Sequence, residues 1–286
     1  MYQSIFSKKY LTTNQIRLGR IQYMNVAPVY YAMHLFDQRN IQFTGAPPST
    51  LNRMLADGEL DISPVSSVAY AQNQDQWELL PNLSISSFGK VLSVKLVSRY
   101  PFKKLNDKNI VLSSESDTAA ALLKLLLARQ NIASHFTKRP VVSPEWLNDS
   151  DDAALIIGDN ALKYSWEQIF PNTYDLGEMW YFQTRLPFVF GVWAVRKEFA
   201  ETHPEIVRRM TDRFYQSKKL GLKNIASISR IASQKLGIDI RTCHEYYQCL
   251  NYDLTHEHMA GMLCFFDGLI KNYTKKISGK KTSNVI

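Results

Sequence analysis

Apolar and polar positions alternate along the first 90 residues in a way that predicts strands and helices in turn. Short apolar stretches at Ile16–Ile21, Ile41–Thr44 and Leu60–Ser63 have the length of buried strands. Between them, residues Val29–Phe36 are predicted to form a helix, and Ser49 is expected to cap a second one. This alternation is typical of a mainly parallel sheet flanked by helices.

A second unit of the same kind follows. Pro64 and the pair Ser66–Ser67 are expected to open a short helix, after which the strand Leu92–Ser98 leads away from the first unit. The rest of the second unit is predicted from continuous apolar strands and one Ala/Leu-rich helix. The strands are Ile110–Ser113, Ala153–Ile157 and Leu186–Val195, and the helix is Ala119–Arg129.

The order of these elements predicts an α/β protein of two lobes. Residues 1–97 and 191–286 are assigned to the first lobe and residues 98–190 to the second, so the chain crosses between the lobes twice. Two crossings make a hinged cleft, and the loops at strand carboxyl ends are where open α/β sheets bind ligands.

Serines are unusually frequent at the predicted strand ends. They occupy positions 63, 66, 67, 84, 86, 87, 93 and 98. Hydroxyls and backbone N–H groups at helix starts bind anions without a buried cation. Each serine alone is explained by capping or turn formation, but together they indicate a crevice for a small carboxylate.

Composition excludes several other classes of protein. The apolar share of 45% and charged share of 21% are those of a globular protein, and no apolar run approaches the length of a membrane helix. The start lacks the apolar stretch of a secretory signal, which predicts a cytoplasmic protein. Cys243, Cys249 and Cys264 have no paired or zinc-like spacing, so no metal site is expected.

The net charge of +8 is concentrated in the last third of the chain. Residues 188–286 carry 16 Lys and Arg against 9 Asp and Glu, and the tail contains Lys275–Lys276 and Lys280–Lys281. No finger, RNA-recognition signature or interleaving of aromatic and basic residues accompanies the excess. Solvated helix faces explain it better than nucleic-acid binding.

Five segments, in order and at sensible spacing, resemble the chorismate dehydratases of the futalosine pathway of menaquinone biosynthesis. They are RIQYMNVAP (20–28), GELDISPVSS (58–67), LPNLSISS (80–87) through Ser93, SSESDT (113–118), and IGDNAL (157–162) with YDLG (174–177) and LPFVF (186–190). Arg185 departs from the pattern, since a small residue such as Gly is expected there. The resemblance covers residues 16–195 and weakens beyond them.

The resemblance implies a periplasmic-binding-protein type II fold with the ligand cleft between the lobes. It also implies loss of water from chorismate to give 3-[(1-carboxyvinyl)oxy]benzoate, without cofactor or metal. Asn25 and Ser93 are then expected to act at the reacting centre. The rest of the expected site binds substrate and consists of Tyr23, Ser66, Ser67, Ser86, Ser116, Asp117, Thr118, Gly158 and Asp159.

Several of these residues have a simpler structural explanation. Asn25 can be an ordinary cap in a strand-to-helix loop, and Ser116, Asp117 and Thr118 can cap the helix that starts at Ala119. Asp159 is an acid facing a dianion, so we expect it to brace its loop.

Two other functions remain open from the sequence. The sister enzyme of the pathway, 1,4-dihydroxy-6-naphthoate synthase, would need a histidine base, and none of the six histidines lies in the five segments. A non-catalytic protein that binds small carboxylates would use the same fold.

Overall fold

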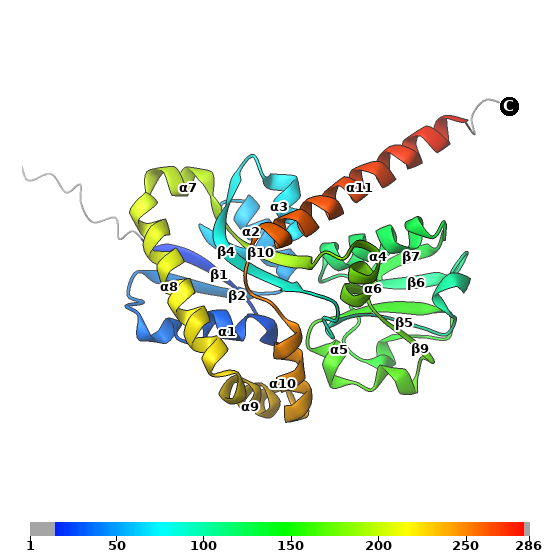
Figure 1. Cartoon of the computed structure of the whole chain (residues 1–286), viewed down its shortest axis with the longest axis horizontal. Helices are drawn as coiled ribbons and strands as arrows, with labels where there is room; N and C mark the ends of the chain where they lie inside the picture. Colours follow the sequence, from blue (N-terminus) through cyan, green and yellow to red (C-terminus); the bar gives the residue numbers. More distant parts are fainter. Residues whose placement is uncertain (1–14, 283–286) are drawn as a thin grey trace, which may run out of the picture.

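The computed structural model describes residues 15–282, with side chains described up to residue 272. Two five-stranded sheets lie side by side, each covered by helices (Figure 1). The first sheet has the strand order β2-β1-β3-β10-β4 and the second has the order β7-β6-β8-β5-β9. The α/β class and the two-lobed architecture predicted from the sequence are confirmed.

The strands of the first sheet are β1 (Ile16–Ile21), β2 (Ile41–Ala46), β3 (Ile62–Ser66), β4 (Trp77–Ser87) and β10 (Phe188–Arg196). Those of the second sheet are β5 (Val94–Ser98), β6 (Asn109–Ser113), β7 (His135–Arg139), β8 (Ala153–Ile157) and β9 (Asn172–Asp175). The helices are α1 (Ala27–Tyr30), α2 (Pro48–Ala56), α3 (Ser67–Asn73), α4 (Asp117–Arg129), α5 (Asn160–Lys163), α6 (Leu176–Thr184), α7 (Lys197–Thr202), α8 (Pro204–Lys223), α9 (Ile225–Leu236), α10 (Ile240–Cys249) and α11 (His256–Thr282).

Both sheets are mixed, which corrects the expectation of a mainly parallel first sheet. Strand β1 is parallel to β2 and β3, but β10 runs antiparallel between β3 and β4. In the second sheet β5 is likewise antiparallel to β8 and β9. Strands β5 and β10 each directly follow a crossing between the lobes, so the chain enters each sheet from the opposite end.

The strand pairing places the crossings slightly earlier than residues 98 and 190. Strand β5 is entirely part of the second sheet, and all of β10 belongs to the first. The chain therefore passes between the sheets at residues 88–93 and 185–187. The apolar sequence of each strand predicts the strand itself but carries no signal for which sheet it joins. The division of the chain into two independent folding units stays a prediction.

Two predicted starts of helices differ from the structure because of proline. Helix α2 begins at Pro48, with Pro47 as its flanking residue, and Ser49 lies inside its first turn. Proline is favoured at this position because its fixed φ suits a first turn. Pro64 belongs to β3, opposite Trp193 of β10. Strand β3 pairs with β1 only at Ile62, which precedes Pro64. Proline has no backbone N–H, and none is needed at Pro64 for pairing with β1.

Arg185 lies at a position where the backbone conformation favours glycine. This conformation explains why a small residue was expected there from the family resemblance. It ends α6 with a φ of 59° in the left-handed region, and its N–H donates to the Tyr181 carbonyl at 2.8 Å. Glycine adopts this conformation without the strain caused by a Cβ. The side chain is exposed, with its guanidinium over the rings of Tyr181 and Phe182.

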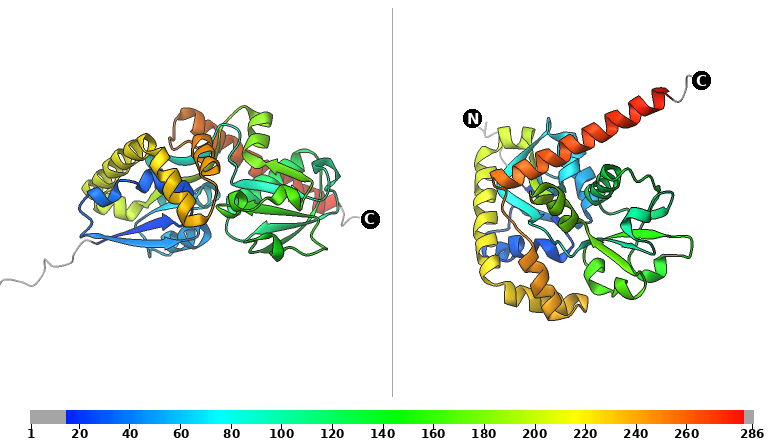
Figure 2. Two further views of the ribbon diagram at one scale, coloured as in Figure 1. Left: turned by 90° about the horizontal axis from the view of Figure 1, so that it is seen from below. Right: turned by 45° about the vertical axis from the view of Figure 1, so that its right-hand side comes forward.

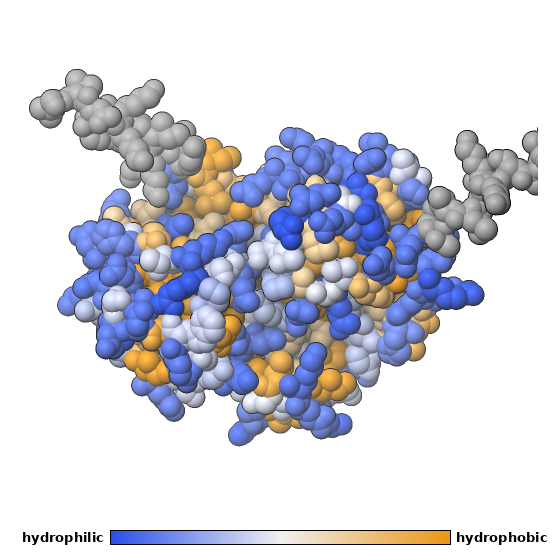
Figure 3. Space-filling model, turned by 180° about the vertical axis from the view of Figure 1, so that it is seen from behind, coloured by the Kyte–Doolittle hydropathy of each residue, from blue (hydrophilic) through white to orange (hydrophobic). Residues whose placement is uncertain are grey.

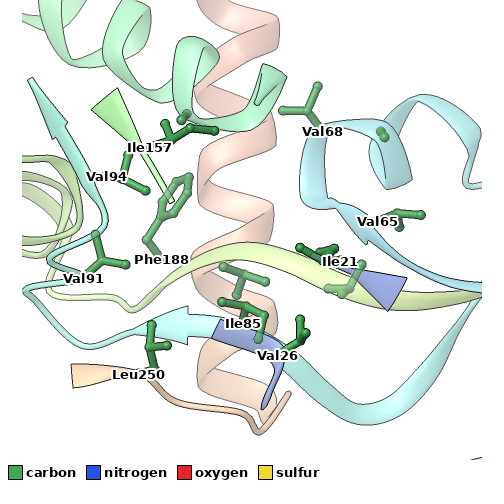
Figure 4. Packing of buried hydrophobic residues seen from close by; sticks show 14 of the residues in the cluster. Ile21, Val26, Val65, Val68, Ile85, Val91, Val94, Ile157, Phe188 and Leu250 are labelled. Atoms are coloured by element: carbon green, nitrogen blue, oxygen red, sulfur yellow. The ribbon is translucent and has the colours of Figure 1, made fainter. Parts of the chain in front are cut away.

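Apolar residues of both lobes meet in one continuous core. Phe188 of β10 lies near Val94 and Ile157 of the second sheet, while Ile85 and Leu250 lie on the side of the first (Figure 4). Both views in Figure 2 show the two lobes next to each other. Apolar packing therefore joins the two lobes in addition to the polar contacts between them.

Charged residues of the last third of the chain lie mostly on exposed faces of α8, α9 and α10, as expected for solvated helices. Hydrophilic residues cover most of the face seen in Figure 3, and hydrophobic ones form separate patches. Lys218 is an exception. It is buried, and its Nζ donates to Asp253 at 2.7 Å and to the Asn82 carbonyl at 2.7 Å.

One buried carboxylate ties three strands of the first sheet together. Asp61, just before β3, accepts hydrogen bonds from the Arg17 backbone and Nε atoms at 2.9 and 3.1 Å, and from Arg196 at 3.0 Å. Burial alone would raise the Asp61 pKa, but the hydrogen bonds from Arg17 and Arg196 outweigh it and the pKa is lowered. The ionised form therefore stabilises the fold above the pKa of the unfolded chain.

We expect Asp61→Asn to lower the free energy of unfolding by about 2 kcal/mol at pH 7, the usual size for a hydrogen bond to a charged group. The difference from the native protein should shrink as the pH falls below about 4, the pKa in the unfolded chain, and on through the lower pKa of folded Asp61. Urea unfolding over this pH range measures it, with exposed Asp75→Asn as the control. A difference that does not change with pH would contradict the assignment.

Candidate active site

Most of the expected site residues gather where the two lobes meet. A 3₁₀ turn at Met24–Val26 follows β1, and the loop after β8 carries Gly158 and Asp159 across from it. The starts of α3 and α4 face each other, since α3 follows β3 of the first sheet and α4 follows β6 of the second. Loops at strand carboxyl ends thus meet at one place, as in other open α/β folds.

Two hydrogen bonds join the turn after β1 to the second lobe. The Tyr23 hydroxyl donates to Glu115 Oε2 at 2.6 Å, and the Met24 N–H donates to Asp159 Oδ1 at 3.1 Å. Gly158 permits this approach, because a Cβ there would lie 2.9 Å from the Tyr23 ring. Asp159 therefore ties its loop to the turn after β1.

The Asp159 carboxyl is unusually basic. Burial raises its pKa from 3.8 to about 6, and the nearby Glu115 adds to this, while the Met24 hydrogen bond and Lys235 act in the opposite direction. Burial likewise raises the pKa of Tyr23 far above its usual range, and the bond to Glu115 contributes. Tyr23 thus remains a neutral hydrogen-bond donor.

The helix starts contact each other through hydroxyls. Thr118 Oγ1 accepts from the Val68 N–H at 3.1 Å and lies 3.4 Å from Ser67 Oγ. Ser66 and Ser116 are the caps of α3 and α4, accepting from Ala69 and Ala119 at 3.3 and 3.1 Å. Capping explains Ser66 and Ser116, while Ser67 and Thr118 make the contact between the lobes.

Asn25 has a buried amide oxygen with no hydrogen-bond partner among the described residues. An unpaired buried acceptor costs about 1–3 kcal/mol, so such atoms are rare in native proteins. Asn25 could have been an ordinary helix cap. No side-chain cap hydrogen bond is made at the 3₁₀ turn or at α1, so the structure gives no support for that role.

Helix α10 supplies two tyrosines that the sequence did not indicate. The Tyr246 hydroxyl donates to Ser93 Oγ at 3.0 Å, and the Tyr247 hydroxyl donates to the Met24 carbonyl at 3.0 Å. The Ser93 carbonyl accepts from the Gly158 N–H at 2.9 Å. Two adjacent tyrosines on a helix do not by themselves indicate a site. Tyr246 reaches Ser93 only through the fold.

Two expected residues are placed elsewhere. The Ser86 hydroxyl donates to the Asn251 carbonyl at 3.1 Å, in a ladder that fixes the segment before α11. Asp117 is exposed at the first turn of α4 and pairs with Lys138 at 2.7 Å. Neither joins the group around Asn25. Within residues 15–272 no cluster of three or more His, Cys, Asp or Glu has the arrangement of a metal site.

A family model described as menaquinone biosynthesis matches residues 16–270. The chain belongs to this menaquinone-biosynthesis family. A chorismate dehydratase of Thermus thermophilus is 30% identical over 88% of the chain and 94% of its own length. A 1,4-dihydroxy-6-naphthoate synthase of the same organism is 27% identical over 53% of the chain and 54% of its own length.

Solved structures similar to this family member support the fold alone. Protein AF1704 of Archaeoglobus fulgidus has a TM-score of 0.74 at 19% identity, covering 93% of the chain and 98% of its own. The alkanesulfonate-binding protein SsuA of Xanthomonas axonopodis has a TM-score of 0.66 at 15% identity, covering 91% and 93%. The predicted periplasmic-binding-protein fold is confirmed. No described helix is long and apolar enough to cross a membrane.

The raised Asp159 pKa gives a pH dependence of known sign. Between the unfolded pKa near 4 and about 6, the folded protein keeps a proton on Asp159 that the unfolded chain has lost, so stability falls as pH rises. We expect the melting temperature of the native protein to drop relative to Asp159→Asn from pH 4 to pH 6. Exposed Asp149→Asn serves as the control, and a constant difference would contradict the assignment.

Proposed function

We propose that the chain is a lyase that removes water from chorismate and forms 3-[(1-carboxyvinyl)oxy]benzoate. The observation that carries this is the 30% identity to a chorismate dehydratase across 94% of that protein. The match to the naphthoate synthase covers only about half of either chain, which favours the dehydratase. The cytoplasmic location stays a prediction from the sequence.

The reaction needs positioning more than strong chemistry. The proton leaves C3 of the ring, the hydroxyl leaves C4, and together they form water, so nothing is oxidised or reduced. Formation of an aromatic ring drives the elimination. The protein has to hold the ring, assist the departing oxygen and place a base.

Asn25 is suited to hold the leaving hydroxyl. Chorismate at neutral pH carries two carboxylates and an ether, which only accept hydrogen bonds, and its C4 hydroxyl is its one donor. The buried and unpaired Asn25 Oδ1 can be satisfied by that donor alone among the groups of this substrate. The amide nitrogen of the same side chain can then donate to the oxygen as negative charge develops.

The base is best supplied by the substrate itself. An amide cannot take a proton at pH 7, and the two nearby carboxylates are engaged, Asp159 with the Met24 N–H and Glu115 with the Tyr23 hydroxyl. The carboxylate of the enolpyruvyl arm is attached beside C3 and can remove its proton. Ser93, held by Tyr246, would orient the substrate from the opposite wall.

The start of α4 can hold a substrate carboxylate. This helix of 13 residues presents backbone N–H groups beside the hydroxyls of Ser116 and Thr118. Because Thr118 now contacts Ser67 and Val68 directly, a carboxylate can enter only when the lobes separate. The hinge segments at 88–93 and 185–187 permit this motion, and closure would exclude water.

Histidine positions weigh against the naphthoate synthase. Of the six histidines, His258 is buried in α11 against Phe88, and none of the other five is buried. A purely binding role would leave chorismate intact. Incubating the purified protein with chorismate and recording benzoate-type ultraviolet absorption separates the three functions.

We expect Asn25→Ala to lower kcat by roughly 10²–10³, the usual cost of removing one preorganised polar group. Product affinity should change much less. Asn25→Asp should lose both binding and turnover, because it places a negative charge beside a dianion.

Asn73→Ala is the matched control, since that amide donates to the Ala69 carbonyl within α3. Steady-state kinetics, product titration and melting temperature are measured for all variants. Near-native turnover by Asn25→Asp would remove Asn25 from the reacting centre, because Asp and Asn cap helices about equally well.

We also expect the free protein to open in solution. Small-angle scattering should give a smaller radius of gyration at saturating product than without it. Tyr23→Phe, which removes the bond to Glu115, should leave the product-bound value unchanged and raise the free value. Identical scattering profiles with and without product would rule out hinge closure.

A further inference from the structure

Helix α11 carries a buried apolar stripe and, beside it, an exposed one. Met262 and Phe265 belong to the buried stripe, and the Phe265 ring meets the ring of Phe188 in β10. Leu263 directly follows Met262, and a step of one residue turns a helix by about 100°. Leu263 is 59% exposed, and Ile270, seven residues further on, is 66% exposed. These two side chains therefore point away from the sheet that the helix covers.

The exposed stripe has the spacing of a coiled-coil seam. Its members follow one another at intervals of four, three and four residues, and they are Met259, Leu263, Phe266 and Ile270. In the sequence the alternation continues with Tyr273 and Ile277, whose side chains lie outside the described part. Single exposed apolar residues are ordinary on a protein surface. A row at this spacing is instead the pattern by which two helices pair.

The second half of α11 extends beyond the body of the molecule. A Cβ at Gly268 would lie 3.0 Å from Leu125 and 3.5 Å from Arg129, the last residue of α4. From there the helix continues to Thr282 and points away from the two lobes (Figure 1 and the right-hand view of Figure 2). Most helices in proteins are stabilised by packing of an apolar face. A second helix along the exposed stripe would supply that packing.

The charges of α11 are separated along its length. Residues 256–270 include Glu257 and Asp267 but no Lys or Arg, whereas residues 271–282 include five Lys and no Asp or Glu. Two copies of this helix in parallel would bring their basic ends together. In an antiparallel pair, the basic half of each helix lies beside the acidic half of the other. Opposite charges beside a seam determine which helices pair and in which direction.

We propose that α11 joins two copies of this chain through the exposed stripe, as an antiparallel pair of helices. Phe266 of each copy packs beside Ile270 of the other, and the two-fold axis passes near Gly268. Such an interface uses the same surface on both copies, which is the commonest symmetry of soluble oligomers. The proposal does not rest on the proposed function, because it concerns assembly alone.

A lipid surface fits the exposed stripe less well than a second copy does. Helices that lie on membranes bury a broad apolar face and carry basic residues on the other. The stripe of α11 is narrow, and its first half is acidic through Glu257 and Asp267, which anionic headgroups would repel.

The molar mass of the full chain, measured by light scattering during size exclusion at micromolar concentration, tests the pairing. We expect a dimer for the native protein and at least about tenfold weaker association for Leu263→Glu and for Ile270→Glu, since each would bury an unpaired charge. Leu222→Glu is the matched control, because Leu222 is an exposed leucine of α8 and should leave the dimer intact. The melting temperature of each variant, compared at a dilution where the native protein dissociates, should stay near the native value. A monomeric native protein, or equal dissociation by Leu222→Glu, would overturn the proposal.

Disulfide cross-linking tests the direction of the pair, in a chain with Cys249 and Cys264 replaced by serine. Asp267→Cys lies near the two-fold axis and should link two copies, whereas Lys276→Cys lies at opposite ends of the pair and should not. Cross-linking through position 276 without linking through position 267 would contradict the antiparallel arrangement. Vesicles containing phosphatidylglycerol complete the test. A monomeric protein that binds them, and loses this binding with Ile270→Glu, would assign the stripe to a lipid surface and overturn the proposal.

Discussion

The hydrogen bond from the Met24 N–H to the half-buried Asp159 carboxylate joins the two lobes at the turn that carries Asn25. A buried N–H or carboxylate without a partner costs several kcal/mol, so neither group can be enclosed unless the other meets it. The two come from different lobes. Closing the cleft therefore pairs these two groups. The turn that carries Asn25 is held from the second lobe by this bond and from α10 by the Tyr247 hydroxyl, which donates to the Met24 carbonyl.

A second, half-buried carboxylate makes the same kind of contact at the hinge. Asp175, at the start of α6, accepts from the N–H groups of Val91 and Leu92 at 3.1 and 2.7 Å, and from Glu178 at 3.1 Å. Leu92 has a φ of 61°, which few residues other than glycine adopt. The first crossing is thus held by its backbone. Burial raises the Asp175 pKa, while these N–H groups oppose the change.

The sequence pattern predicted the strands β1, β6 and β8 and the cap of α4 at Ser116. These features are determined by apolar runs and capping residues within a few positions along the chain. It could not predict that β10 would enter the first sheet between β3 and β4, since that pairing joins distant residues. Ser86 and Ser67 look alike in sequence, yet one fixes the segment before α11 and the other meets Thr118. Tyr246 reaches Ser93 only through the path of α10.

The place of β10 between β3 and β4 also affects how the chain can be assembled during its synthesis. Residues of the second sheet, from β5 to β9, form one continuous stretch of chain, so all of its strands leave the ribosome before β10 does. The first sheet lacks the strand between β3 and β4 until residue 196 has been made, although four of its five strands appear earlier. The edges of β3 and β4 that later pair with β10 therefore remain unpaired while the second lobe is synthesised. An unpaired strand edge can pair with another chain and cause aggregation. Buried serines lie along β4 and at the end of β3. These two strands are therefore more polar than the apolar strands of the second lobe while they lack their partner.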